Sequence, residues 1–164
     1  MLKRASLWLP IVLLGAVAGA QEKPGVLTVE GRDGKQKAFS LEQLKQLPRQ
    51  AVSVTDPHDK SSHRYEGVPV SALLAAVGAP SGQALHAAEL RDYVEAAGAD
   101  GYRVIFALAE LDSLFQDNKV IVADTLDGKA LEPSRGPLTL IAPQDHHPSR
   151  WVHSLVSLKV RQAP

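Results

Sequence analysis

Six of the side chains that could bind a metal ion lie in two polar segments of the chain. The first segment, 56–64, contains Asp56, His58 and His63, and the second contains Asp145, His146 and His147. Imidazole nitrogens suit zinc, copper and nickel, so this donor set would suit a first-row metal. The spacing matches no established ligand motif, and adjacent histidines point in different directions in an extended segment. We therefore predict solvated loop histidines, with histidine-based divalent-metal binding as the alternative.

A second group of candidates lies near the C terminus. Arg150 and Trp151 place a planar cationic donor next to an aromatic ring, a combination that suits an anionic ring ligand. The alternative is that Trp151 packs into the core while Arg150 is solvated, and the sequence leaves both open. Glu110 and Asp112 do not form an acid–base pair, because their i, i+2 spacing places them on different sides of a helix. We expect both carboxylates to be solvated.

The chain has no cysteine among its 164 residues. Thiol catalysis, thiolate zinc sites and iron–sulfur clusters are therefore excluded. Neither the glycine-rich phosphate loops of nucleotide-binding proteins nor the GxSxG motif of serine hydrolases occurs. The common nucleotide-binding and serine-hydrolase functions thus have no support.

Short elements of both kinds must position these residues. Ser40 and Gln43 match a capping box that begins a helix over 41–47, and a second helix is predicted over 71–77. The turn signal Asp127-Gly128 separates two later strands. We predict a loop over 56–64, a helical turn within 108–115, and strands at 26–30, 51–55, 93–97, 102–107, 120–123, 138–142 and 152–160. This mixture, without regular strand–helix alternation, predicts one α+β domain.

The first twenty residues have the layout of a cleavable secretory signal. Lys3 and Arg4 precede an apolar run of about a dozen residues and a small-residue end at Ala20. The run is shorter than the roughly 20 residues of a spanning helix, so we expect no membrane span after cleavage. This predicts a signal peptide at 1–20, a domain at 21–164 and a periplasmic or secreted location. Without Lys3 and Arg4 the 18 basic residues fall to 16 against 18 acidic ones, so nucleic-acid binding has no electrostatic support.

Four segments in a fixed order carry a family resemblance: YEGVPVSALLAAVGA (65–79), DGYRVIF (100–106), GPLTLIAP (136–143) and RWVHSL (150–155). Together they resemble the oxidoreductase molybdopterin-binding domain of the sulfite oxidase family. The resemblance implies a single sulfite oxidase-like α+β domain, with strand-rich mixed sheets and short helices. It also implies a molybdopterin cofactor with molybdenum held by a cysteine thiolate.

The resemblance also implies a cofactor site, from which this chain departs. The family's cysteine would fall near Thr55 or Asp56, and Asp56 would be a harder oxygen ligand for the metal. The family's phosphate-holding arginine corresponds to Arg150, but the second cation is replaced by His153, which is mostly neutral at pH 7. The candidate cofactor-binding residues are therefore Thr55, Asp56, His58, His146, His147, Arg150 and His153, with Asp56 as the candidate metal ligand.

Two functions remain open at this stage. Folded molybdoenzymes generally use a twin-arginine signal, and this chain has Lys3-Arg4, which favours export without an inserted cofactor. The first hypothesis is a cofactor-poor or non-catalytic module that binds a small anionic or pterin-like ligand or a protein partner. The second is a molybdopterin-dependent oxidoreductase, transferring oxygen atoms or electrons to a redox partner from a metal site without cysteine.

Overall fold

The structure is a computed structural model and describes residues 26–55 and 60–164. The helices are α1 (Leu41–Lys45), α2 (Val70–Ala75) and the 3-10 turns η1 (Gly82–Ala84), η2 (Ala87–Arg91), η3 (Leu108–Leu111) and η4 (Pro148–Arg150). The strands are β1 (Leu27–Glu30), β2 (Gln36–Phe39), β3 (Gln50–Thr55), β4 (Ser62–Pro69), β5 (Asp92–Gly98), β6 (Arg103–Ala107), β7 (Ile121–Leu126), β8 (Lys129–Ala130), β9 (Thr139–Ile141) and β10 (Leu155–Gln162).

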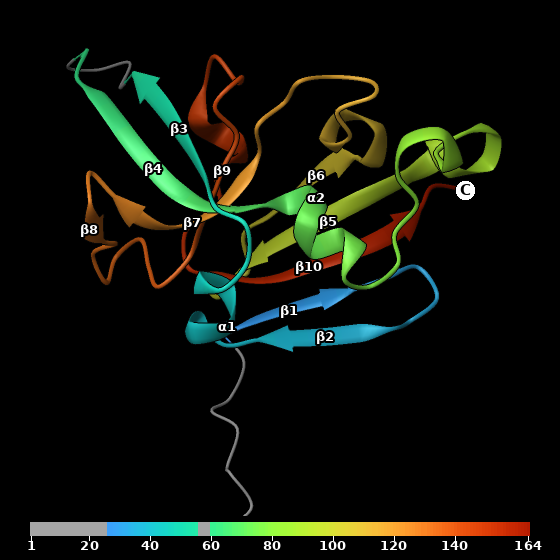
Figure 1. The fold of residues 1–164 in the computed structure, drawn as a ribbon, viewed down its shortest axis with the longest axis horizontal. Coiled ribbons are helices and arrows are strands. Elements are labelled where there is room, and N and C mark those ends of the chain that lie inside the picture. Colours follow the sequence, from blue (N-terminus) through green and yellow to red (C-terminus); the bar gives the residue numbers. More distant parts are fainter. Residues whose placement is uncertain (1–25, 56–59) are drawn as a thin grey trace, which may run out of the picture.

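The strands form two sheets (Figure 1). The first has the order β2-β1-β10-β5-β6, in which β1 and β10 pair in parallel and the other neighbours are antiparallel. The second has the order β3-β4-β7-β8, with β9 also paired to β7. Helix α2 contacts β4 of the second sheet and β1 of the first, which ties the two sheets together. The predicted single α+β domain is confirmed.

Local sequence signals explain several of these elements. The Ser40 hydroxyl accepts a hydrogen bond from the Gln43 amide, and the Gln43 side chain accepts one from the Ser40 amide, so the predicted capping box begins α1. Asp127 and Gly128 both have positive φ, as a type I′ turn requires, and they join β7 to β8. In β4, a Cβ atom on Gly67 would lie 2.0 Å from the carbonyl oxygen of Val122, so only glycine fits this close strand approach.

The apolar side chains form two buried clusters. The larger one extends between the sheets and includes Leu73 and Leu74 of α2. The smaller one consists of Val52, Tyr65, Ile121, Ala123 and Ile141. Trp151 packs against both clusters, so it anchors the segment before β10 at the place where they meet.

One sequence prediction was wrong in part. The segment 56–64 was expected to be a loop, but Ser62, His63 and Arg64 begin the long strand β4 and pair with β3. Their polar side chains gave no apolar alternation because the burial along this end of the strand is low. The signal-peptide prediction and the candidates Asp56 and His58 lie outside the described residues.

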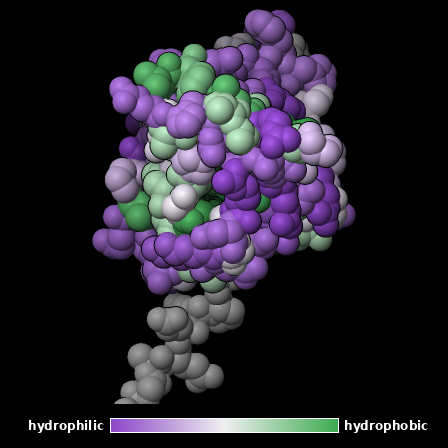
Figure 2. Space-filling view, turned by 90° about the vertical axis from the view of Figure 1, so that its right-hand side faces the viewer, coloured by the Kyte–Doolittle hydropathy of each residue, from purple (hydrophilic) through white to green (hydrophobic). Residues whose placement is uncertain are grey.

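Large hydrophobic side chains reach the surface of the described chain at Leu90, Tyr102, Ile105, Leu114, Phe115 and Val156. Figure 2 shows one face on which hydrophobic patches are separated by hydrophilic side chains. Isolated surface hydrophobics are normal in soluble domains. No helix in the described part of the chain is long and apolar enough to cross a membrane.

Candidate anion-binding pocket

A cavity of about 200 Å³ lies where the free end of the β3–β4 hairpin faces the segments that flank β9 and precede β10. Its apolar walls are Val54, Tyr65, Pro143, Pro148 and Trp151. Its polar walls are Thr55, His63, Arg135, Asp145, His146 and His153. The volume is below the roughly 300–1,000 Å³ of typical small-molecule pockets, so the space suits a small ligand.

The aromatic wall of the pocket is held in place. The rings of Tyr65 and Trp151 meet edge to face with centroids 5.7 Å apart, a favourable geometry for two aromatic side chains. The indole Nε1 of Trp151 donates a hydrogen bond of 3.1 Å to the carbonyl of Ala142. Tyr65 is only 2% exposed and belongs to the smaller core cluster. Trp151 therefore has a fixed orientation beside the cavity.

Arg135 supplies a cation to this pocket. Its Nη1 donates to the Tyr65 hydroxyl at 2.9 Å, and its backbone carbonyl accepts from the Ser154 amide at 3.0 Å. The residue is half-buried. Within residues 26–55 and 60–164, no carboxylate forms an ion pair with Arg135 and no group accepts from its Nε or Nη2. The pocket thus contains an arginine whose charge has no protein counter-ion in the described chain.

His153 lies beside this arginine because two segments run together. Leu155 donates to the Leu138 carbonyl, and Ser154 donates to the carbonyls of Arg135 and Gly136. Burial of the imidazole and, next, the positive charge of Arg135 lower the pKa of His153, while Asp100 acts in the opposite direction. His153 is therefore neutral at pH 7 and acts as a hydrogen-bonding group rather than as a second cation.

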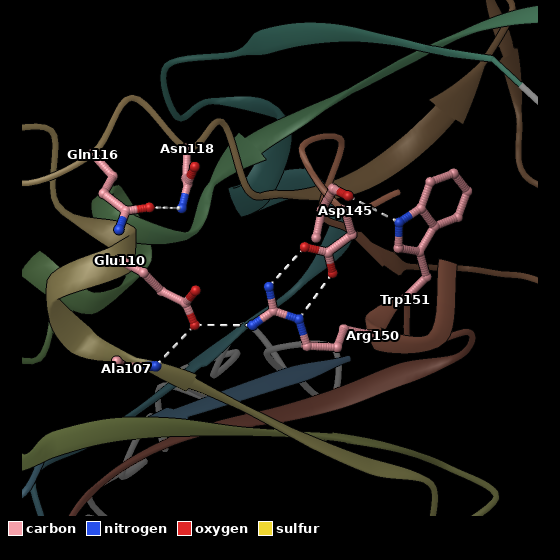
Figure 3. A network of polar contacts seen from close by, with 8 residues as sticks. Ala107, Glu110, Gln116, Asn118, Asp145, Arg150 and Trp151 are labelled. Carbon is pink, nitrogen blue, oxygen red and sulfur yellow. Dashed lines mark hydrogen bonds and ion pairs between the residues drawn. The ribbon is translucent and has the colours of Figure 1, made fainter. Parts of the chain in front are cut away.

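Arg150 has a different environment (Figure 3). Its Nε and Nη2 donate to the two carboxylate oxygens of Asp145 at 2.8 and 2.7 Å, and its Nη1 donates to Glu110 at 2.9 Å. The guanidinium carbon lies 4.4 Å from the ring centroid of Phe106. Hydrogen bonds from Arg150 to Asp145 and Glu110 raise the arginine pKa further, against the effect of burial. Arg150 connects η3 to the loop after β9.

This network corrects two expectations about the residues around it. Glu110 is not simply solvated, since its carboxylate also accepts from the Ala107 amide and its side chain is 21% exposed. Asp112 is also engaged, because it accepts from the amides of Gly82 and Leu114. Both carboxylates have structural duties that their local spacing did not reveal.

The predicted site residues are brought together only in part. Thr55, His146 and His153 line the pocket, whereas Arg150 reaches it only through its partner Asp145. His147 is outside the lining, and its Nδ1 lies 2.7 Å from the Ser149 hydroxyl.

His63 was expected to be solvated, but it joins two neighbours. Its Nε2 lies 3.0 Å from the Ser61 hydroxyl and its Nδ1 lies 2.8 Å from Asp127. Both ring nitrogens of this pocket residue therefore have partners within the chain.

The family-model comparison covers residues 20–164 and matches the oxidoreductase molybdopterin binding domain. The chain belongs to this family. Among solved structures it is similar to the sulfane dehydrogenase SoxCD from Paracoccus pantotrophus, with a TM-score of 0.65 and 21% identity. The match covers 84% of this chain and 38% of that chain, so it supports the fold alone. No curated protein matches the sequence.

The family implies a molybdopterin cofactor, and the donor groups of this chain can be tested against it. A thiolate ligand to molybdenum does not fit, because the sequence has no cysteine. In the part of the chain that the structure describes, no group of three or more His, Cys, Asp or Glu side chains could hold a metal ion. The donor set therefore does not match thiolate-bound molybdenum, and Asp56 as an oxygen ligand stays a prediction.

Sequence reasoning missed Arg135 and the role of Tyr65. Arg135 lies in the turn-like segment EPSRGP, which reads as an ordinary surface turn. The only local signal is that a cation directly precedes the glycine and proline of GPLTLIAP, a segment on which the resemblance rests. Its contact with Tyr65, 70 positions away, depends on the pairing of distant strands.

Proposed function

We propose that this domain is a binding module for a small anionic ligand, taken up at Arg135 without thiolate-bound molybdenum. The observation that supports the proposal is the half-buried Arg135 guanidinium, which lines the pocket and has no carboxylate partner in the described chain. Removing a cation from water is costly unless an opposite charge compensates for it. A bound anion would provide that compensation.

The charges around the cavity support an anion rather than a cation. Asp145 is the one carboxylate among the described residues of the lining, and both of its oxygens accept from Arg150. Asp127, which pairs with His63, has its pKa lowered by the hydrogen bond from the Arg64 amide and then by His63. Among the described residues these carboxylates already have hydrogen-bonded partners, whereas no opposite charge contacts Arg135, which is the group of the lining that an anion can reach.

The second candidate is a molybdopterin-dependent oxidoreductase, and family membership favours it. It would require a metal site built without cysteine, for which Asp56 is the candidate ligand. A pterin-like ligand without metal is the alternative occupant within the first proposal, and the cavity of about 200 Å³ favours a smaller one. The periplasmic or secreted location belongs to the same proposal, and cell fractionation of the full chain would test it.

The test is a titration of the full chain with sodium sulfate. Binding is measured by isothermal calorimetry and by the chemical shifts of the backbone amides. We expect saturable binding, with Arg135→Gln weakening it about tenfold or more, as loss of a charged hydrogen-bond donor of about 1.5–3 kcal/mol implies. Arg103→Gln is the matched control, because Arg103 is 61% exposed and pairs with Glu95 on the first sheet. Equal affinity in wild type and Arg135→Gln, or no binding by the wild type, would overturn the proposal.

A further inference from the structure

The two half-buried arginines use their guanidinium edges differently. Arg150 binds the carboxylate of Asp145 with Nε and Nη2, one donor to each oxygen. This paired geometry is the preferred way for arginine to bind a carboxylate. At Arg135 only Nη1 is engaged, by Tyr65, and the same Nε–Nη2 edge has no acceptor in the described chain. Arg135 thus offers the same carboxylate-binding edge as Arg150, but no carboxylate of the described chain occupies it.

The wall beside this edge is aromatic and apolar. Trp151 is oriented by its hydrogen bond to the Ala142 carbonyl and by its edge contact with Tyr65, and Pro143 and Pro148 complete the surface. A rigid aromatic side chain offers contact area at low entropic cost. A cavity of about 200 Å³ corresponds to about six or seven water molecules at ~30 Å³ each. This space suits a single ring better than a larger fused or phosphorylated group.

Charge balance favours a ligand with one negative charge over a dianion. Both oxygens of Asp145 accept from Arg150, and His153 is neutral because burial and Arg135 lower its pKa. Arg135 therefore contributes the one uncompensated charge among the described lining residues. A dianion such as sulfate can bind at Arg135 but binds less tightly, because its second charge would be partly buried without a counter-ion.

We propose that the ligand of this pocket is a small, flat monocarboxylate, with its carboxylate on the Nε–Nη2 edge of Arg135 and its ring against Trp151. The inference rests on the proposed function and specifies its ligand class. In this proposal Arg135 binds the carboxylate of the ligand, and Trp151 favours ligands with a flat ring.

Calorimetric titrations of the full chain with sodium benzoate, cyclohexanecarboxylate, acetate and sulfate test the inference. We expect benzoate to bind about tenfold more tightly than acetate, and more tightly than cyclohexanecarboxylate, since aromatic pairs add about 0.5–1.5 kcal/mol beyond area burial. Arg135→Gln should abolish this binding. Trp151→Leu should reduce benzoate affinity to that of acetate.

A second measurement tests the role of Trp151 without replacing it, because Trp151 also packs against both core clusters. Trp8→Phe leaves Trp151 as the sole tryptophan of the chain, so its fluorescence reports on the pocket alone. Benzoate should change this emission saturably, and acetate should not. If benzoate binds no better than acetate and leaves the emission unchanged while sulfate still binds through Arg135, the ligand class is wrong and the anion-binding function stands. If no anion binds, both fail.

Discussion

Arg150 and Arg135 are both half-buried, yet only Arg150 forms ion pairs with carboxylates of the described chain. Arg150 contacts two carboxylates and an aromatic ring, whereas Arg135 contacts one phenolic hydroxyl. The residue that the family resemblance marks as a phosphate ligand therefore supports the loop after β9. The cation that faces the pocket comes from a different segment of the chain.

The two arginines therefore differ in their capacity to bind an anionic ligand. A cation held by neighbouring carboxylates is already compensated, and binding an anion there would require those ion pairs to break. A cation with one neutral partner retains most of its capacity for an anionic ligand. The residues around Arg150 fix the pocket wall, and in our proposal Arg135 attracts the anionic ligand.

The largest expected effect comes from removing the supporting arginine. Arg150→Gln should lower the free energy of unfolding by about 2 kcal/mol, because it leaves two partly buried carboxylates without their charged donor. Urea denaturation of the full chain measures this loss. Arg103→Gln serves as the control, and its exposed ion pair should change stability by less than about 0.5 kcal/mol. If both substitutions lowered the free energy of unfolding equally, Arg150 would support the fold no more than an exposed ion pair does.

A smaller effect on stability is expected at the pocket. In anion-free buffer, Arg135→Gln should change the free energy of unfolding by less than about 1 kcal/mol, since one hydrogen bond to the Tyr65 hydroxyl is lost. Adding sulfate should raise the melting temperature of the wild type and not that of this variant. A loss as large as that of Arg150→Gln would show that Arg135 is itself a structural support.

The smallest effect is a change in the titration of His153. Arg135→Gln should raise the pKa of His153, because the charge of Arg135 is one of the causes that lower it. Since the folded-state pKa is depressed, protonation of His153 opposes folding as the pH falls below about 6.5, its usual value. In the Arg135→Gln variant, protonation of His153 should therefore lower the free energy of unfolding by less than in the wild type. Imidazole proton shifts measure the pKa, and an unchanged value would mean that Arg135 does not act on this ring.

Much of the fold followed from local patterns. The Ser40–Gln43 capping box, the Asp127-Gly128 turn and the alternation in 26–30 and 51–55 each depend on residues close in sequence. The start of β4 was missed because its first residues are polar and little buried, so they show no alternation of apolar and polar side chains. The pairing of β1 with β10 has no local signal at all.

The candidate site was harder to predict for the same reason. Thr55, His146 and His153 were named from the resemblance, and the structure places them in one pocket. Arg150 could not be recognised as saturated, because its partner Glu110 lies 40 positions away. Arg135 could not be recognised as unpaired, because the absence of a counter-ion in the described chain is a property of the folded structure.

The central claim is that this member of a molybdopterin-binding family works without thiolate-bound molybdenum. The most direct test is the molybdenum and pterin content of the full chain, expressed in its own host and purified from the compartment to which it is delivered. The account predicts molybdenum far below one atom per chain in material that still binds sulfate through Arg135. One molybdenum atom and one pterin per chain would contradict it.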